Sequence, residues 1–175
     1  MKKILSILLA LTLFAALLAG CSGQQKPSQP QEEPAAAEPE GIYVAMNGVN
    51  ISLGIPFADL QDKLGEEVKP SETINSCDEN SDWKQTMHFY DGVTVTEDKD
   101  GLIDGVEVSG DAAALMGKIR ISSTKDEVIE VMGEPDTDAE WGMYYTTTNP
   151  WVNIYLDEET GAITGFALMK SMVAG

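Results

Sequence analysis

A repeated segment limits what this 175-residue chain can fold into more than any other feature of its sequence. Residues 51–66 align without a gap with residues 119–134, and both segments begin with isoleucine and end with Gly-Glu. The apolar positions between these ends also match: Leu53, Leu60 and Leu64 correspond to Ile121, Val128 and Met132. A repeat of this kind indicates two copies of one supersecondary unit.

Each copy is predicted to contain one short helix. In the second copy, Ser123 followed by Asp126 is close to a capping box, which favours a helix start, and Gly133 is a typical left-handed stop. In the first copy, Pro56 suits the first helical turn and Gly65 follows the last residue of the apolar stripe. The two helices are therefore expected at matching places in the two copies.

Strands are predicted after each helix, because apolar and polar residues alternate there. The alternating segments are residues 93–96 and 106–108 in the first copy, and residues 152–156 and 166–168 in the second. Gly101 and Gly161 close the turns between them, as in tight hairpins, and Asn47-Gly48 is a further hairpin signal upstream of the first helix. Such alternation is typical of antiparallel sheet with one solvated face.

These elements together predict an α+β fold made of two tandem repeats. The first repeat is expected to span residues 41–110 and the second residues 111–175. Each would consist of a short helix, or a pair of helices, packed on an antiparallel sheet of three to four strands.

The first forty residues predict an export signal and a tether. Two lysines precede an apolar run over residues 4–18, and the run ends in Leu-Ala-Gly-Cys21. This ending resembles the lipobox of bacterial lipoproteins, which implies that residues 1–20 are a signal peptide and that Cys21 carries lipid. Residues 21–40 hold half of the eight prolines and suit an extended tether. We therefore expect an extracytoplasmic protein, held by lipid to the cell membrane or an outer membrane.

The charge of the chain narrows the classes of partner. The formal net charge is −18, and removal of Lys2 and Lys3 with the signal peptide leaves nine basic against 29 acidic residues, or −20. Such a chain repels nucleic acid and anionic lipid headgroups. Membrane attachment is therefore expected through the lipid anchor alone, with a protein as the partner. The acidity itself suits either plain solubility or docking to a basic partner or a cation.

Residues 118–135, with the aromatic segments 141–145 and 152–156, resemble the SmpA/OmlA lipoproteins. These are accessory components of the machinery that assembles outer-membrane β-barrels, and they contain a helix followed by aromatic-rich strands. Ser122-Ser123 stands where that family has Gly-Met. The tandem arrangement also resembles the β-lactamase inhibitor protein fold, whose sheets clamp another protein. The resemblance implies a non-catalytic binding role, as an envelope or surface adaptor or as an enzyme inhibitor.

Aromatic residues of the second repeat are the candidate binding residues. If the apolar residues of segment 152–156 face the core, the intervening side chains face outward. Trp and Tyr on an exposed sheet face are typical of protein-binding surfaces. The candidates are Trp141, Tyr145, Trp151 and Tyr155. The alternative is that these rings pack under a loop or against the first repeat.

A calcium loop is the alternative site. Carboxylates at Asp98, Asp100, Asp104 and Glu107 follow the spacing of an EF-hand loop from its third position onward. Thr96 occupies the first ligand position, however, and the flanking residues predict strands. A plain β-turn is therefore the competing interpretation, and a cation- or small-ligand-binding lipoprotein is the alternative function.

Catalysis is not predicted. The chain has one histidine, His88, and once Cys21 is lipidated one remaining thiol, Cys77, which we expect to be buried or inert. No spacing links the two as a nucleophile and base. No cofactor or resident metal site is predicted beyond the calcium alternative.

Overall fold

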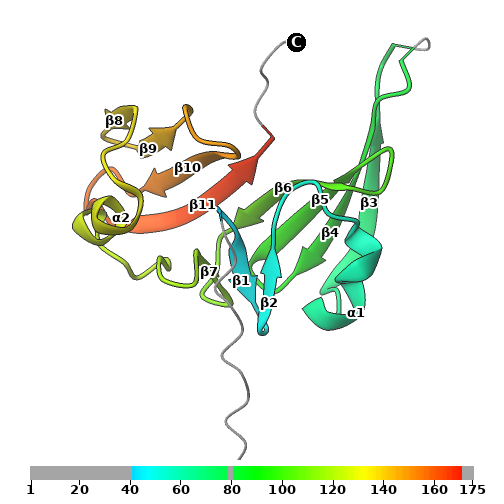
Figure 1. The fold of residues 1–175 in the computed structure, drawn as a ribbon, viewed down its shortest axis with the longest axis horizontal. Helices are drawn as coiled ribbons and strands as arrows, with labels where there is room; N and C mark the ends of the chain where they lie inside the picture. The colour runs from blue at the N-terminus through cyan, green and yellow to red at the C-terminus, as the bar shows by residue number, and fades with distance from the viewer. Residues whose placement is uncertain (1–40, 79–80, 171–175) are drawn as a thin grey trace, which may run out of the picture. The chain divides into compact units, whose positions relative to one another are not determined.

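The computed structural model describes residues 41–78 and 81–170, which fold mainly as antiparallel sheet (Figure 1). These residues belong to one compact unit, Glu38–Gly175. The signal peptide, Cys21 and the tether lie outside the described residues. Within the described part, no helix is long and apolar enough to cross a membrane.

An eight-stranded sheet dominates the structure. Its strand order is β3-β4-β5-β6-β11-β10-β9-β8, and every neighbouring pair is antiparallel. The strands are β3 (Lys69–Asn75), β4 (Lys84–Tyr90), β5 (Val93–Asp98), β6 (Ile103–Val108), β8 (Thr137–Ala139), β9 (Gly142–Tyr145), β10 (Trp151–Leu156) and β11 (Ile163–Met169).

A second, three-stranded sheet has the order β2-β1-β7, formed by β1 (Val44–Met46), β2 (Val49–Ile51) and β7 (Ala113–Leu115). The turn between β1 and β2 is made by Asn47 and Gly48, whose φ angles are +51° and +76°. Both angles are positive, as a two-residue hairpin turn requires, so the hairpin predicted from Asn47-Gly48 is confirmed.

The helical segments are short. A 3₁₀ turn, η1 (Phe57–Asp59), leads into α1 (Gln61–Leu64), and α2 spans Lys125–Met132. The N-cap of α2 is Thr124, whose hydroxyl accepts a hydrogen bond from the Glu127 N–H, while the Glu127 carboxylate accepts one from the Thr124 N–H at 2.7 Å. The capping box therefore lies one residue later than the predicted Ser123–Asp126 pair. It uses the more common glutamate at its third position.

The prediction of two helix-on-sheet repeats is wrong. Strands β6 and β11 pair directly, with Val108 opposite Phe166 and Val106 opposite Leu168, so the strands of both halves belong to one sheet. Backbone N–H and C=O groups of both strands are satisfied by this pairing, whereas two separate sheets would leave them as unpaired edges. The helices are also too short to cover a sheet each.

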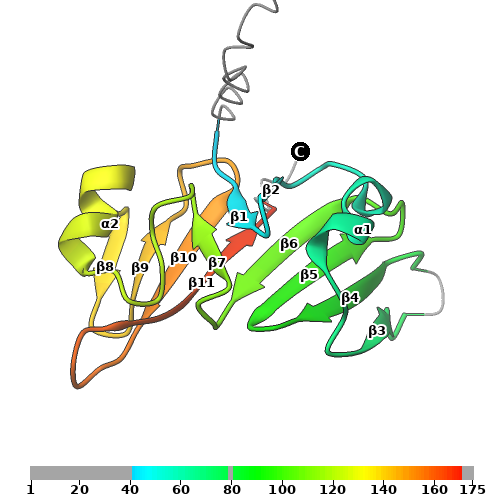
Figure 2. The same ribbon diagram turned by 90° about the horizontal axis from the view of Figure 1, so that it is seen from below.

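One core lies between the large sheet and the elements that pack on it. Leu64 of α1, Val128 of α2, Leu115 of β7, Val95 of β5 and Phe166 of β11 belong to a single buried cluster. Figures 1 and 2 show both helices and the three-stranded sheet on the same side of the eight-stranded sheet. The other side of the large sheet is therefore left open by these elements, and we call it the open face.

Candidate functional site

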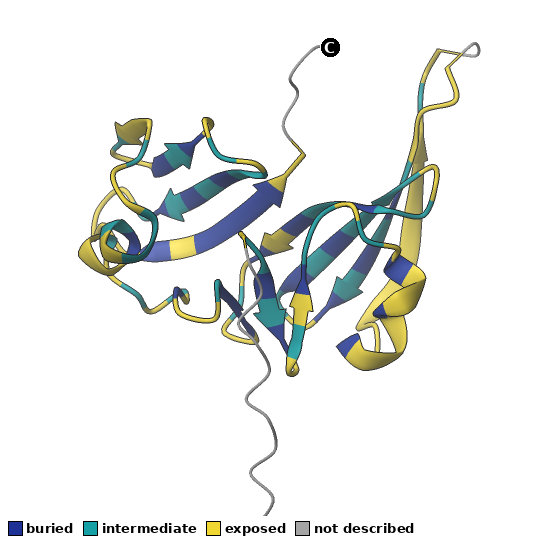
Figure 3. Ribbon diagram, in the orientation of Figure 1, coloured by how far each residue is buried: buried dark blue, intermediate teal, exposed yellow. Residues whose placement is uncertain are grey.

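The register of the strands identifies which side chains form the open face. Along β10, buried residues alternate with half-buried ones, and the same alternation runs through β4 and β5 (Figure 3). Two rows of paired residues cross the open face. One row is Tyr144, Asn153, Ala167, Glu107, Thr94 and Phe89, and the other is Trp151, Met169, Gly105, Thr96 and Met87.

Aromatic rings lie close to the backbone on the β9–β10 part of this face. Trp141 and Tyr144 meet edge to face, with ring centroids 5.2 Å apart. A Cβ atom at Gly165 would lie 3.3 Å from Cδ2 of Tyr155. The Tyr155 ring therefore packs over Gly165, which has no side chain. Burial, and then the nearby Tyr155, raise the pKa of Tyr144 above its ordinary value. Trp141, Tyr144 and Tyr155 therefore lie near one another on this part of the open face, with apolar rings and polar edges.

The predicted aromatic residues divide between the two faces of the sheet. Trp141 is 56% exposed, and Trp151 and Tyr155 are half-buried on the open face. Tyr145 is only 2% exposed, because it pairs with the core residue Val152, and its hydroxyl donates to the Gly133 carbonyl at 2.9 Å. Burial, together with nearby carboxylates, raises the pKa of Tyr145 to about 12.

Sequence reasoning missed Tyr144, which lies on the open face where Tyr145 was expected. Strand β9 begins at Gly142, so Trp141 lies in the turn before it and does not share a strand face with Tyr145. Tyr145 faces inward because it pairs with the buried Val152, and this register depends on the connection between β9 and β10, which alternation within either strand does not specify. Trp83, which is 46% exposed just before β4, was also missed, because its segment carries no periodic signal.

A groove of about 530 Å³ crosses the middle of the open face. Its base contains the small residues Gly105 of β6 and Ala167 of β11. They are diagonal neighbours, because Gly105 pairs with Met169, two residues beyond Ala167. Larger side chains surround this base: Trp83, Gln85, Asp104, Glu107, Tyr155, Met169 and Lys170. The groove therefore combines apolar and aromatic surface with two carboxylates and one ammonium group.

Asp104 is the polar residue with incomplete hydrogen bonding in this groove. Its Oδ2 accepts a hydrogen bond of 2.9 Å from the side-chain amide of Gln85. Its Oδ1 is buried and has no hydrogen-bond partner among the described residues. A buried acceptor without a partner is uncommon and destabilising, so this oxygen is a cost to the fold that the Gln85 hydrogen bond to Oδ2 does not offset.

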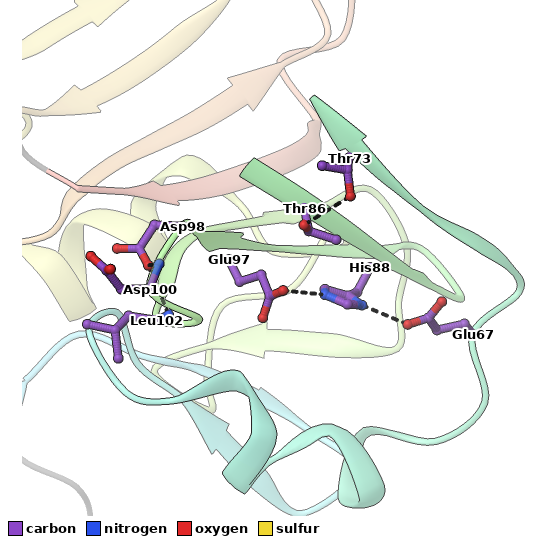
Figure 4. A network of polar contacts seen from close by, with 8 residues as sticks. All are labelled: Glu67, Thr73, Thr86, His88, Glu97, Asp98, Asp100 and Leu102. Atoms are coloured by element: carbon purple, nitrogen blue, oxygen red, sulfur yellow. Dashed lines mark hydrogen bonds and ion pairs between the residues drawn. The ribbon is translucent and has the colours of Figure 1, made fainter. Parts of the chain in front are cut away.

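The four carboxylates of the calcium alternative do not converge. Asp98 Oδ1 instead accepts hydrogen bonds from the N–H groups of Asp100 and Leu102, at 2.9 and 3.0 Å, and so closes the β5–β6 turn (Figure 4). Asp104 and Glu107 lie beyond this turn on β6. Among residues 41–78 and 81–170, no group of three His, Cys, Asp or Glu side chains could hold a metal ion. The plain β-turn interpretation therefore fits this segment better.

His88 lies on the core side of the sheet, between two carboxylates (Figure 4). Its Nδ1 is 2.8 Å from Glu67 Oε1, and its Nε2 is 3.6 Å from Glu97 Oε1. The ring also stacks on Phe57 of η1 at 3.8 Å. These contacts tie the helical segment to β4 and β5, so the geometry indicates a structural role. Cys77, which we expected to be buried or inert, is exposed and therefore not buried.

Comparison with known proteins gives little beyond the fold. No family model matches the chain, and no curated protein matches it. A crystal structure of an extracellular protein containing a SCP domain, from Bacillus anthracis str. Ames, is similar with a TM-score of 0.50 at 14% identity. The match covers 67% of this chain but only 44% of that protein, which is less than half of its length. The similarity is thus one of fold alone.

Proposed function

We propose that this chain is an extracytoplasmic lipoprotein, anchored at Cys21, which binds another protein through its open face. The observation that carries the proposal is the aromatic area formed by Trp141, Tyr144, Trp151 and Tyr155, which are partly exposed on a sheet face that both helices leave free. Large aromatic side chains with a polar edge contribute strongly to protein–protein binding.

The lipobox-like ending at Cys21 supports the location, and so does the description of the structural neighbour as an extracellular protein. The resemblance of residues 118–135 to the SmpA/OmlA lipoproteins supports an adaptor in the envelope or at the surface. Inhibition of an extracellular enzyme is the narrower form of the same proposal. In both forms the chain binds and does not catalyse.

Affinity capture tests the role of the open face. The full-length, detergent-solubilised protein would be incubated with envelope extract, and captured proteins would be identified by mass spectrometry. We expect a specific partner whose recovery falls at least about tenfold with Trp151→Ala or Tyr155→Ala, because a binding hot spot contributes about 2 kcal/mol or more.

Tyr43→Ala is the matched control for this capture. Tyr43 is also a half-buried tyrosine, but it lies before β1 on the side of the three-stranded sheet. Its substitution is expected to leave recovery unchanged. Equal recovery from all three variants and the wild type would rule out the open face as the binding surface.

Metabolic labelling tests the anchor. A lipid label should enter the wild type but not Cys21→Ser, because the cysteine thiol is the proposed acylation site. Equal labelling of both proteins, or none of either, would contradict the proposed attachment.

A further inference from the structure

We infer that the outer edge of β3 pairs with an extended, uncharged segment of another protein, which would add one strand to the eight-stranded sheet. This inference goes beyond the proposed function, because it uses main-chain groups at the end of the sheet and not the aromatic area. Three observations carry it: the unpaired edge, the direction of its backbone groups and the exposed apolar side chains beside it.

The two edges of the eight-stranded sheet differ in how well they are shielded. Strand β8 is an edge of only three residues, and its Asp138 forms an ion pair with Lys125 of α2. Strand β3, at the other end of the sheet, has seven residues, and all of them are exposed (Figures 1 and 2). Short edge strands protect a sheet from pairing with other chains, whereas long exposed edge strands invite it. Strand β3 is therefore the edge that is open to a further strand.

The hydrogen bonds to β4 determine which backbone groups of β3 point outward. The N–H of Ser76, directly after β3, donates to the Trp83 carbonyl at 3.0 Å and so points towards β4. Backbone groups alternate in direction along an antiparallel strand, so the N–H and C=O groups of Thr73 and Asn75 point away from β4. Among residues 41–78 and 81–170, no strand lies beyond β3 to pair with them.

An extended main chain is the ligand that matches these outward groups. Thr73 and Asn75 each offer one donor and one acceptor, and the two pairs recur about 7 Å apart along the edge. The backbone of another extended segment presents acceptors and donors at the same repeat, so it satisfies all four groups together. In this mode of recognition, main-chain hydrogen bonds provide affinity and the alternating side chains provide specificity.

The side chains beside the edge favour an apolar residue in the added strand. Of the large apolar side chains that are exposed in the described part of the chain, three lie on or next to the β3–β4 hairpin: Val68, Ile74 and Trp83. Ile74 pairs with Gln85, which lines the groove, so Ile74 lies on the open face. A residue that pairs with Ile74 from an added strand would contact it on that face, because directly opposite side chains are neighbours.

The charge of β3 favours an uncharged segment from a different protein. The only charged residues of this strand, Lys69 and Glu72, form an ion pair with each other at 3.0 Å. Residues Thr73, Ile74 and Asn75 are uncharged, so this part of the edge has no charge for a basic or acidic side chain to pair with. A second copy of this chain is disfavoured as the occupant, since two molecules of charge −18 repel each other.

Cys77 allows a direct test, because this exposed thiol lies two residues beyond Asn75. A seven-residue peptide of alternating threonine and valine would be attached to Cys77 of the detergent-solubilised full chain through a glycine-serine linker and a disulfide bond. Attachment raises the effective concentration of the peptide to about the millimolar range, so that weak pairing is also detected. Amide hydrogen exchange, measured by NMR, then reports whether the outward N–H groups are bonded.

We expect exchange at the N–H groups of Thr73 and Asn75 to slow at least about tenfold when the threonine-valine peptide is attached. A polyproline peptide with the same length and linker has no N–H group and should leave both rates unchanged. Unchanged exchange with the threonine-valine peptide, or equal slowing by the two peptides, would overturn the inference. Slowing that appears without peptide and grows with protein concentration would assign the edge to a second copy, and would also overturn it.

Two variants at one position isolate the outward N–H. Asn75→Pro removes this donor and keeps the hydrogen bonds to β4, since proline is tolerated in edge strands where the N–H faces solvent. Asn75→Ala removes only the side chain. With the threonine-valine peptide attached, the slowing at Thr73 should persist in Asn75→Ala and fall at least about fivefold in Asn75→Pro. Slow exchange of the Ser76 N–H in both variants would show that the hairpin is intact, and equal slowing at Thr73 would then overturn the inference.

The inference and the proposed function fail in different ways. In the capture from envelope extract, recovery of the partner should fall with Asn75→Pro but not with Asn75→Ala. If Trp151→Ala lowers recovery while the two Asn75 variants recover the partner equally, the open face binds protein and the inference about β3 is overturned. If Asn75→Pro alone lowers recovery, the edge of β3 binds the partner and the open face does not.

Discussion

Two adjacent tyrosines show how strongly the position of a single residue in a strand decides its role. Tyr144 points to the open face and takes part in the aromatic area, whereas Tyr145 points into the core. The hydroxyl of Tyr145 is held by the Gly133 carbonyl at the end of α2, so this residue links the helix to β9. A shift of one residue exchanges the two roles, because side chains alternate between the faces of a strand.

Alkaline unfolding tests the placement of Tyr145. Burial raises the pKa of Tyr145 to about 12 from an ordinary value of 10.0, so the folded state resists loss of the phenolic proton. Its contribution to stability is therefore present below about pH 10 and is lost as the pH rises towards about pH 12. At neutral pH, Tyr145→Phe should lower the free energy of unfolding by about 1 kcal/mol through loss of the hydrogen bond.

The difference between the wild type and Tyr145→Phe should then shrink as the pH rises from about 10 to about 12, as measured by denaturant unfolding at a series of pH values. For Tyr144→Phe, we expect the difference in unfolding free energy from the wild type to change less over this pH range, because the Tyr144 ring is only half-buried. A constant difference across the alkaline range would contradict the buried position of Tyr145.

At the scale of single elements, the sequence predicted several local structures but not how far-separated strands pair. Alternation at residues 93–96 and 152–156 marked strands that are present as β5 and β10. The hairpin at Asn47-Gly48 was predicted because its signal is local. The pairing of β6 with β11 joins residues that are 58 to 64 positions apart, and no spacing within either strand specifies its neighbour.

The start of α2 gives a direct test of a local assignment. Thr124→Ala removes the cap that accepts the Glu127 N–H and should lower the free energy of unfolding by about 1 kcal/mol. Ser123→Ala should cost less, since the Ser123 hydroxyl accepts only the Arg120 N–H in an exposed turn. Thermal unfolding of both variants measures the difference, and a larger effect at Ser123 would contradict the observed cap.

Strand β11 provides a second test at this scale. A Cβ at Gly165 would lie 2.7 Å from the Val108 carbonyl oxygen, so Gly165→Ala must shift β11 from β6 and should cost about 1–3 kcal/mol. Gly105→Ala is the matched control in the neighbouring strand, because its nearest neighbour is a side-chain atom at 3.5 Å. Denaturant unfolding should separate the two variants, and equal stability would contradict the close pairing of β6 and β11.

For the whole molecule, the central feature is one continuous sheet with one covered and one open face. The covered face is explained by the apolar core, which includes both helices and the three-stranded sheet. The open face carries aromatic rings and a groove, features that packing within the described chain does not explain. Trp151 and Tyr155 could be predicted on this face from alternation, whereas the groove depends on long-range pairing of β5, β6, β11 and β10.

Photocrosslinking in intact cells tests most directly whether the open face binds a protein. A photoreactive amino acid would replace either Asn153, half-buried in the middle of the open face, or Glu130, exposed on α2. We expect a discrete protein adduct from position 153 and none from position 130. Absence of an adduct at position 153, or the same adduct from both positions, would contradict this expectation.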